Sequence, residues 1–299
     1  MLVRPVVQFG QLKRREFITL LGAAAAGWPL AAIAGMVQPT INLLTLLALL
    51  LCEGRQAIAL EEPQSSAAEA LVRAYPDVLD RIEGNDLVWK DGTRMSVDDG
   101  KGPKPFEAML DHPDIKDMFA MTYPRGDKGI PPEINSDPGR IRYLALFNKM
   151  YGDCQKRDLV AEGVNVVWLR SKYGKTVRFS RRNHAADALQ QVSDELDHLP
   201  NQFLEYLRPL QGTYNCRPIA GTNRPSAHGW GIAIDIAAAH SHYWLGPKPD
   251  TASRIAYKNE TPWEIVRVFE KYGFIWGGKW YHYDTMHFEY RPEILINAK

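Results

Sequence analysis

The chain has 299 residues, of which 45% are hydrophobic and 24% charged, values that are ordinary for a globular protein. Its 36 basic and 35 acidic residues nearly cancel, so the overall charge gives no electrostatic case for a nucleic-acid partner. The length alone would allow one large domain or two small ones.

Residues 1–59 have the features of an export leader. Arg14 and Arg15 precede the apolar stretch Thr19–Gly35, a pattern that resembles a twin-arginine signal. A second signal-like unit follows, and its first residue, Met36, is an alternative start of translation. The apolar core of this unit is shorter than the about 20 residues that span a bilayer. We therefore expect export by the twin-arginine or general secretory route to a periplasmic or other extracytoplasmic compartment, with membrane association through an uncleaved leader as the alternative.

Export would place the cysteines in an oxidising compartment, where disulfides form. Removal of Cys52 with the leader leaves an even pair, Cys154 and Cys216. A bridge between them would tie the middle of the chain to the region beside Arg217. The sequence leaves open whether these thiols pair or stay separate, because a bridge requires a Cα separation that the spacing does not reveal.

The region 60–180 is expected to be an N-terminal accessory region, with a substrate-shaping extension as the alternative. Asp91-Gly92 lies between two β-prone runs and predicts a hairpin over Asp86–Val97. The prolines and glycines of residues 123–140 indicate a loop. Two short strands are predicted after it, at Val164–Leu169 and Thr176–Ser180.

The region 181–299 is expected to be the catalytic domain. Apolar residues at helical spacing predict a helix over Asn183–His198, followed by a short helix over Gln202–Leu207. Thr261–Glu264 predicts a capping box, with proline at the first helical position, that opens a helix ending at Gly273. Three strands are predicted, at Gly212–Ile219, Gly231–Ile236 and His287–Tyr290.

The alternation of side chains assigns the faces of these strands. The three isoleucines of residues 231–236 alternate onto one face, so Asp235 points the opposite way. His287 and Glu289 likewise share one face of the last strand. Adjacent strands joined by a helix indicate an α+β fold with a small antiparallel sheet and flanking helices, not a parallel doubly wound sheet.

His228, Asp235 and His287 are the residues that we expect to hold a single zinc ion. Two histidines and a carboxylate are a suitable ligand set for zinc, with a fourth position left for water. The spacing of His228 and Asp235 is not the helical HExxH pattern, so the pair converges only if Gly229 and Gly231 let the backbone turn.

Four further residues are candidates for the chemistry. Asp284 is the candidate general base, because a carboxylate beside a metal-bound water can take its proton and deliver it to the leaving amine. Arg217 is the candidate for stabilising the oxyanion formed when water attacks an amide. Ser226 either binds the substrate backbone or shapes the turn, and Glu289 is expected to orient a metal ligand.

Other residues near these motifs leave alternatives open. His240, His242 and His282 are expected to be rim or structural residues, although any of them would replace a ligand if the assignment were wrong. The tryptophans of this region either line a substrate cleft or form the core around the sheet. They are Trp230, Trp244, Trp276 and Trp280.

These motifs resemble a known family. Arg217, the pattern Ser-x-His-x-x-Gly-x-Ala-x-Asp over residues 226–235 and the pattern Asp-x-x-His-Phe-Glu over residues 284–289 are similar to those of the D-alanyl-D-alanine carboxypeptidase family of zinc metallopeptidases. The resemblance covers roughly Thr213–Pro292. The family includes vancomycin-resistance D,D-peptidases and phage endolysins, and it shares its core with lysostaphin-type peptidases and the hedgehog signalling domain.

The resemblance implies one zinc ion on His228, Asp235 and His287, with Asp284 as base and Arg217 at the place of the transition-state arginine. It implies peptidoglycan stem peptides as the substrate and a D-alanyl-D-alanine carboxypeptidase as the activity. The D,D-dipeptidase branch has glutamate where this chain has Asp284, so the scissile bond stays open. The alternatives are an endopeptidase of the same fold that cuts L-Ala-D-Glu or a cross-link, and a zinc-stabilised wall-binding module without turnover.

Overall fold

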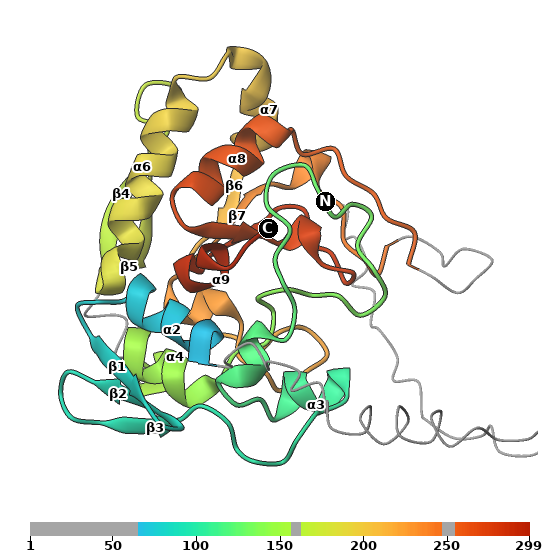
Figure 1. Cartoon of the computed structure of the whole chain (residues 1–299). Helices are drawn as coiled ribbons and strands as arrows, with labels where there is room; N and C mark the ends of the chain where they lie inside the picture. The colour runs from blue at the N-terminus through green and yellow to red at the C-terminus, as the bar shows by residue number, and fades with distance from the viewer. Residues whose placement is uncertain (1–64, 157–162, 247–254) are drawn as a thin grey trace, which may run out of the picture. The chain divides into compact units, whose positions relative to one another are not determined.

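The computed structural model describes residues 65–156, 163–246 and 255–299, all within one compact unit that runs from Leu60 to Lys299 (Figure 1). The expected export leader lies outside the described residues. Small antiparallel sheets alternate with short helices along the chain, which confirms the predicted α+β class. None of the helices formed by the described residues combines the length and the apolar character that a membrane span needs.

The N-terminal part is a helix followed by a three-stranded antiparallel sheet. The sheet has the order β1-β2-β3, and its last two strands form the predicted hairpin. In the turn, the Asp91 side chain accepts a hydrogen bond from the Thr93 amide at 2.9 Å. These elements are α2 (Ser65–Ala74), β1 (Leu79–Glu83), β2 (Asp86–Trp89) and β3 (Arg94–Ser96).

Short helices and loops then lead to a two-stranded ribbon. Residues 123–140 form neither a helix nor a strand, as predicted. The ribbon β4–β5 confirms the two predicted strands, and helix α6 packs on it with Leu189 and Val192 fully buried. The elements of this part are α3 (Phe106–Asp111), η1 (Lys116–Phe119), α4 (Leu144–Tyr151), η2 (Cys154–Lys156), β4 (Gly163–Trp168), β5 (Lys175–Ser180), η3 (Arg182–His184), α6 (Ala185–Asp197), η4 (Asn201–Phe203) and α7 (Leu204–Leu207).

The last part of the chain forms a four-stranded antiparallel sheet with the order β6-β7-β9-β8. Phe269 of α8 stacks on Phe288 of β9 with ring centroids 3.8 Å apart, so α8 covers the sheet face opposite His287. The elements are β6 (Leu210–Gly212), η5 (Ala227–Trp230), β7 (Ala233–Ala237), η6 (Ala238–His240), α8 (Trp263–Lys271), β8 (Phe274–Trp276), η7 (Gly277–Lys279), β9 (His287–Tyr290) and α9 (Pro292–Ile296).

The strand predicted over Gly212–Ile219 is wrong beyond its first residue, because β6 ends at Gly212. The following backbone leaves the sheet and pairs with the motif region instead. The Asn215 amide donates to the His228 carbonyl at 3.2 Å, and Pro218 forms only an isolated bridge with Pro225. Proline has no amide hydrogen with which to continue a ladder.

The capping box predicted at Thr261–Glu264 is also wrong. Helix α8 begins after Pro262 without a side-chain cap. The Thr261 hydroxyl instead donates to the Thr285 carbonyl at 3.2 Å, so it ties the start of the helix to the turn before β9. The predicted end of the helix is confirmed, because Gly273 follows α8 with a left-handed φ of 89°.

The N-terminal region and the expected catalytic domain share one hydrophobic core. Helices α2 and α9, from opposite ends of the described chain, lie side by side (Figure 1). Beside them, the buried Tyr75 hydroxyl donates to Glu293 at 2.5 Å, and the buried Tyr123 hydroxyl donates to Glu270 at 2.9 Å. The division of the chain near residue 180 stays a prediction.

Candidate metal centre and active-site cleft

The two halves of the split motif meet on neighbouring strands. Asp235 of β7 lies directly opposite His287 of β9 in the antiparallel register, and His228 lies on η5 just before β7. Between them, Gly231 has a left-handed φ of 66°, which glycine adopts without steric strain. The chain can therefore turn from η5 into β7 and bring together the three residues predicted as ligands, a buried group that could hold a metal ion.

The spacing of the candidate ligand atoms fits a tetrahedral ion. His287 Nδ1 lies 2.8 Å from Asp235 Oδ1 and 3.2 Å from His228 Nε2. His228 Nε2 lies 3.2 Å from Asp235 Oδ2. Ligands at about 2.0–2.1 Å from a tetrahedral zinc ion are about 3.3 Å apart. Both the donor types and their separations therefore fit zinc.

The second ring nitrogen of each histidine is engaged by an oxygen outside this group. His228 Nδ1 donates to the Thr213 backbone carbonyl, which leaves Nε2 facing the other ligands. His287 Nε2 donates to Glu289 Oε1 at 2.8 Å, which leaves Nδ1 facing them. Metal-binding histidines almost always have such a partner, because it sets the tautomer and the ring orientation.

The charges within the group are strongly coupled. Burial raises the pKa of Asp235, but hydrogen bonds from His228 and His287 outweigh burial and hold this pKa below its ordinary value. Burial lowers the pKa of His287, while hydrogen bonds to Asp235 and Glu289 raise it to about 10. A cation at Nδ1 would replace the proton there, so protonation of His287 competes with metal binding.

Glu289 is held in turn by Arg142, a residue that the motif analysis missed. Arg142 Nε donates to Glu289 Oε2 at 3.1 Å, and its Nη2 donates to Oε1. Burial raises the pKa of Glu289. The charge of Arg142 and the hydrogen bond from His287 outweigh burial and hold this pKa well below its ordinary value, so the carboxylate stays ionised. The one available sequence signal is the alternation Arg140-Ile141-Arg142, in which the isoleucine is buried and both arginines line the cavity beside the ligand group.

Asp284 lines the same cavity as the ligand group. Burial raises its pKa to about 6, while the charge of His287 opposes this rise and that of Asp235 adds to it. The Asp284 amide donates to the Gly277 carbonyl at 3.1 Å, and a Cβ at Gly277 would lie 2.6 Å from the Asp284 carbonyl oxygen. This close approach requires glycine at position 277. The location and raised pKa of Asp284 suit a general base.

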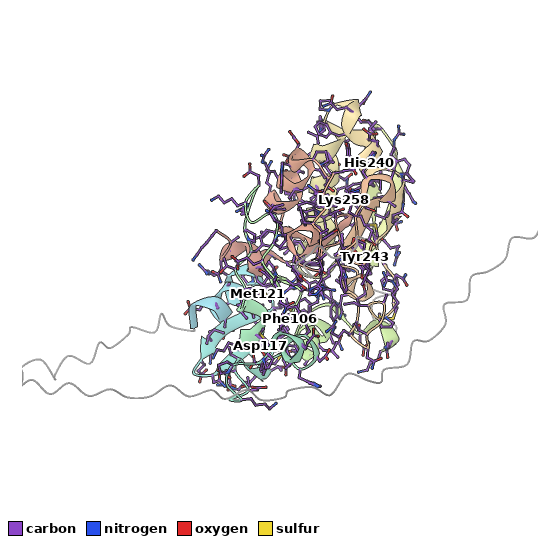
Figure 2. The ribbon with its side chains drawn as sticks, turned by 90° about the vertical axis from the view of Figure 1, so that its right-hand side faces the viewer. Phe106, Asp117, Met121, His240, Tyr243 and Lys258 are labelled. Atoms are coloured by element: carbon purple, nitrogen blue, oxygen red, sulfur yellow. A yellow bond between two sulfur atoms is a disulfide. The ribbon has the colours of Figure 1, made fainter. Side chains whose placement is uncertain are left out.

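The cavity beside the ligand group has a volume of about 260 Å³. Arg217 and Ser226, predicted for oxyanion and substrate contacts, both line it. The Ser226 amide donates to the Arg217 carbonyl at 3.0 Å, so the backbone holds the two residues beside each other. Tyr243 lies on the wall as well and is labelled in Figure 2.

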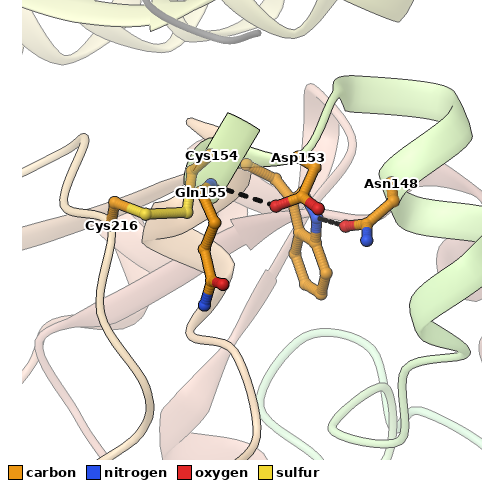
Figure 3. The surroundings of a disulfide bond; sticks show 6 residues. Asn148, Asp153, Cys154, Gln155 and Cys216 are labelled. Atoms are coloured by element: carbon orange, nitrogen blue, oxygen red, sulfur yellow. Dashed lines mark hydrogen bonds between the residues drawn. A yellow bond between two sulfur atoms is a disulfide. The ribbon is translucent and has the colours of Figure 1, made fainter. Parts of the chain in front are cut away.

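The two remaining cysteines form a disulfide, which settles the alternative left open by the sequence. The Cα atoms of Cys154 and Cys216 are 5.7 Å apart, and Figure 3 shows the bridge beside Asp153 and Gln155. The bridge ties η2 to the residue that precedes Arg217. The N-terminal region thus anchors one wall of the cavity.

His240, His242 and His282 lie outside the ligand group. His242 Nε2 lies 2.8 Å and His240 Nδ1 lies 3.2 Å from the two carboxylate oxygens of Glu260. His282 lines the cavity, and its Nδ1 lies 2.8 Å from Asp137 Oδ2. Their positions agree with the expected rim and structural roles.

The tryptophans divide between the two alternatives. Trp280 lines the cavity, with its ring centroid 5.7 Å from that of His287. Trp230 and Trp276 are buried in the core. Trp244 is half-buried and presents an edge-on ring contact to His282 at 4.8 Å.

One comparison with known protein families matches the segment that contains the candidate ligands. Residues 220–290 match the family model described as D-alanyl-D-alanine carboxypeptidase. No curated protein and no solved structure matches the chain. The matched segment contains both halves of the split motif, whereas Arg217 and the two arginines of residues 140–142 precede it. The motifs and this match together show that residues 220–290 are similar to the D-alanyl-D-alanine carboxypeptidase family of peptidases.

Proposed function

We propose that the protein is an exported zinc peptidase that hydrolyses peptidoglycan stem peptides as a D-alanyl-D-alanine carboxypeptidase. The observation that carries this proposal is the convergence of His228 Nε2, Asp235 and His287 Nδ1, with the second nitrogen of each histidine already bonded to an oxygen. The family match over the same segment supports a peptidase.

The mechanism follows from the residues that line the cavity. A zinc ion held by His228, Asp235 and His287 would polarise the scissile carbonyl and lower the pKa of water. Asp284 accepts the proton of the attacking water near neutral pH and then delivers it to the leaving amine. Arg217 offers a fixed positive charge to the oxyanion.

Ser226 has the position expected of a residue that contacts the substrate backbone. It precedes η5 directly, its side chain is buried and it lines the cavity. Its hydroxyl can accept from, or donate to, a peptide group of the substrate. Removal of the hydroxyl should therefore raise KM more than it lowers kcat.

Export supports the choice of substrate, since peptidoglycan lies outside the cytoplasmic membrane. The leader-like residues 1–59 motivate this part of the proposal, and the Cys154–Cys216 disulfide agrees with an oxidising compartment. N-terminal sequencing of the protein from fractionated cells tests it. A cytoplasmic protein that retains the leader would contradict export, and a membrane-bound one would indicate an uncleaved anchor.

A second candidate activity is an endopeptidase of the same fold that cuts L-Ala-D-Glu or a cross-link. Asp284 motivates it, because the resemblance associates aspartate at this position with the endolysin branch as well as with some carboxypeptidases. Digestion of purified muropeptides separates the two activities. Free D-alanine supports the carboxypeptidase, whereas internal cuts without free D-alanine contradict it and support the endopeptidase.

The same assay tests whether the protein turns substrate over at all. Activity should require zinc, disappear with a chelator and return when zinc is restored. Asp284→Asn should lower the rate of hydrolysis about 10²- to 10⁴-fold and still bind zinc. Zinc binding without any muropeptide cleavage by the unaltered protein would favour the wall-binding module instead.

A further inference from the structure

We propose that Arg140 forms a carboxylate-binding subsite of the cavity and holds a carboxylate of the substrate peptide during hydrolysis. This inference rests on the proposed function for the identity of the peptide, but its binding test does not require turnover. Arg140 precedes the family match and belongs to the N-terminal region, for which the sequence identified no individual site residue.

Buried contacts hold the guanidinium of Arg140 in place. Its Nη1 donates to Asp137 Oδ2 at 2.8 Å, and the two side chains are 11% and 0% exposed. Asp137 also accepts from the His282 amide at 3.0 Å, and its Oδ2 lies 2.8 Å from His282 Nδ1. The carboxylate of Asp137 is therefore shared between two groups and only partly engages the five donors of the guanidinium.

Trp280 places Arg140 beside the metal ligands. The guanidinium carbon lies 5.6 Å from the centre of the Trp280 ring, and the same ring lies 5.7 Å from that of His287. The indole is fixed by its own hydrogen bond to the Pro138 carbonyl at 2.9 Å. The Trp280 ring thus contacts both the guanidinium of Arg140 and the ring of His287. Arg140 and the ligand group line the same cavity.

The second neighbour of the subsite also comes from the N-terminal region. Phe106 of α3, labelled in Figure 2, stacks on the His282 ring with centroids 5.7 Å apart. Phe106 packs on the face of the His282 ring, whereas Asp137 bonds to its Nδ1. The subsite is therefore built by three elements: the loop that contains Asp137 and Arg140, helix α3, and the turn before Asp284.

The charge of the cavity favours an anionic ligand. Three arginines line it, namely Arg140, Arg142 and Arg217, and they are balanced by the carboxylates of Asp235, Asp284 and Glu289. A bound divalent cation would make the wall net positive. Of the three arginines, Arg142 is occupied by Glu289, and Arg217 is assigned to the oxyanion.

The proposed ligand is a carboxylate close to the scissile bond. One extended residue adds about 3.5 Å between its two ends. The C-terminal carboxylate of the departing residue of a carboxypeptidase substrate lies about one residue from the scissile carbonyl, and Arg140 and His287 lie 5.6 Å and 5.7 Å from the Trp280 ring centre. A side-chain carboxylate of an acidic stem-peptide residue has the same chemistry, so the test must separate these two sources.

The test compares matched peptides and matched variants in the zinc-loaded full chain. The peptides end in D-alanyl-D-alanine as the free acid or the C-terminal amide, and a second pair carries internal D-glutamate or D-glutamine. Arg140→Gln should raise KM for the charged member of one pair about 10- to 100-fold, with little change in kcat and little effect on the neutral member. Arg140→Lys should fall between the two proteins, because lysine keeps the charge and loses the planar fork.

The control is Arg94→Gln, which removes another arginine of the N-terminal region. Arg94 pairs with Asp86 at 2.9 Å and does not line the cavity. The proposal predicts unchanged KM for this variant. Equal effects of Arg140→Gln on charged and neutral peptides, or an equal effect of Arg94→Gln, would overturn the subsite.

Equilibrium binding separates failure of the subsite from failure of the proposed function. Calorimetry with N-acetyl-D-alanine, its amide and N-acetyl-D-glutamate needs no hydrolysis. The unaltered protein should prefer the acids to the amide, and this preference should disappear in Arg140→Gln. If the unaltered protein shows this preference but cleaves no peptide, the proposed peptidase activity is contradicted and the proposed subsite is supported. An unaltered protein without the preference would sink the subsite, even if Arg140→Gln failed to fold.

Discussion

Arg142 and Glu289 form a buried ion pair across 147 positions of the sequence, with Arg142 Nε 3.1 Å from Glu289 Oε2. Their side chains are 8% and 0% exposed, and Glu289 also accepts from His287 Nε2. A residue of the N-terminal region is therefore linked to the candidate ligand His287 by two successive contacts. Arg142 is a positioning residue, because it reaches the ligand group only through Glu289.

Loss of this pair should weaken metal binding as well as folding. Glu289→Gln preserves the size of the side chain but removes the charge that holds His287, so zinc affinity should fall about 10- to 100-fold. Arg142→Met should also lower zinc affinity and destabilise the fold by about 3–5 kcal/mol, because it leaves the carboxylate buried without its partner. Chelator competition measures the affinity, and urea unfolding measures the stability.

A double-variant cycle shows whether Arg142 acts through Glu289. The effects of the two substitutions on zinc affinity should then be strongly non-additive. Additive losses of affinity would contradict the proposed path. Arg94→Met serves as a matched control, because Arg94 forms a surface ion pair remote from the metal ligands, and it should leave zinc affinity unchanged.

Asp284 should destabilise the metal-free protein above about pH 6. Its folded-state pKa of about 6 is raised above the ordinary value, so its contribution to stability is present at low pH and is lost as the pH rises through 6. Asp284→Asn should therefore increase the free energy of unfolding at pH 8 by about 1–3 kcal/mol and change it little at pH 4. Urea unfolding of chelator-treated protein at both values checks this. Asp127→Asn, at a side chain that is 65% exposed, should show no such pH-dependent gain.

The rate of hydrolysis should fall on the acid side as Asp284 becomes protonated. With the pKa of Asp284 at about 6, kcat/KM should rise with pH up to that value and then level off. A bound cation favours the carboxylate and moves this limb to lower pH. Asp284→Glu should keep an acidic limb, whereas Asp284→Asn should lose about 10²- to 10⁴-fold in rate together with the limb. A limb that persisted in Asp284→Asn would assign the base to another residue.

Reduction of the Cys154–Cys216 bridge should weaken both the fold and the cavity wall. The bridge closes a loop across 62 positions, and its loss should lower the free energy of unfolding by about 2–4 kcal/mol. Because Arg217 follows the bridge directly, kcat/KM should fall under reducing conditions even where the protein remains folded. Mass spectrometry confirms the redox state, and Cys154→Ser with Cys216→Ser should behave like the reduced protein. Identical unfolding of the oxidised and reduced proteins would contradict this role.

Local pattern was sufficient for the α+β class, most elements and the residues that converge on the metal centre. The alternation of isoleucines around Asp235 assigns its face from the geometry of a strand alone, and the structure places it opposite His287. The hairpin at Asp91-Gly92 and the end of helix α8 at Gly273 also follow from short-range backbone preferences. These properties depend on residues that are neighbours in the chain.

Tertiary packing determined the structural features that depend on contacts between residues far apart in the sequence. The backbone after Gly212 leaves β6 because Asn215 bonds to His228, and Thr261 bonds to Thr285 rather than capping its helix. The disulfide and the contacts of the two arginines at 140 and 142 likewise need distances that no local pattern contains. Sequence alone thus predicted the three residues that converge and the candidate base, whereas only the folded chain showed that residues of the N-terminal region line the same cavity.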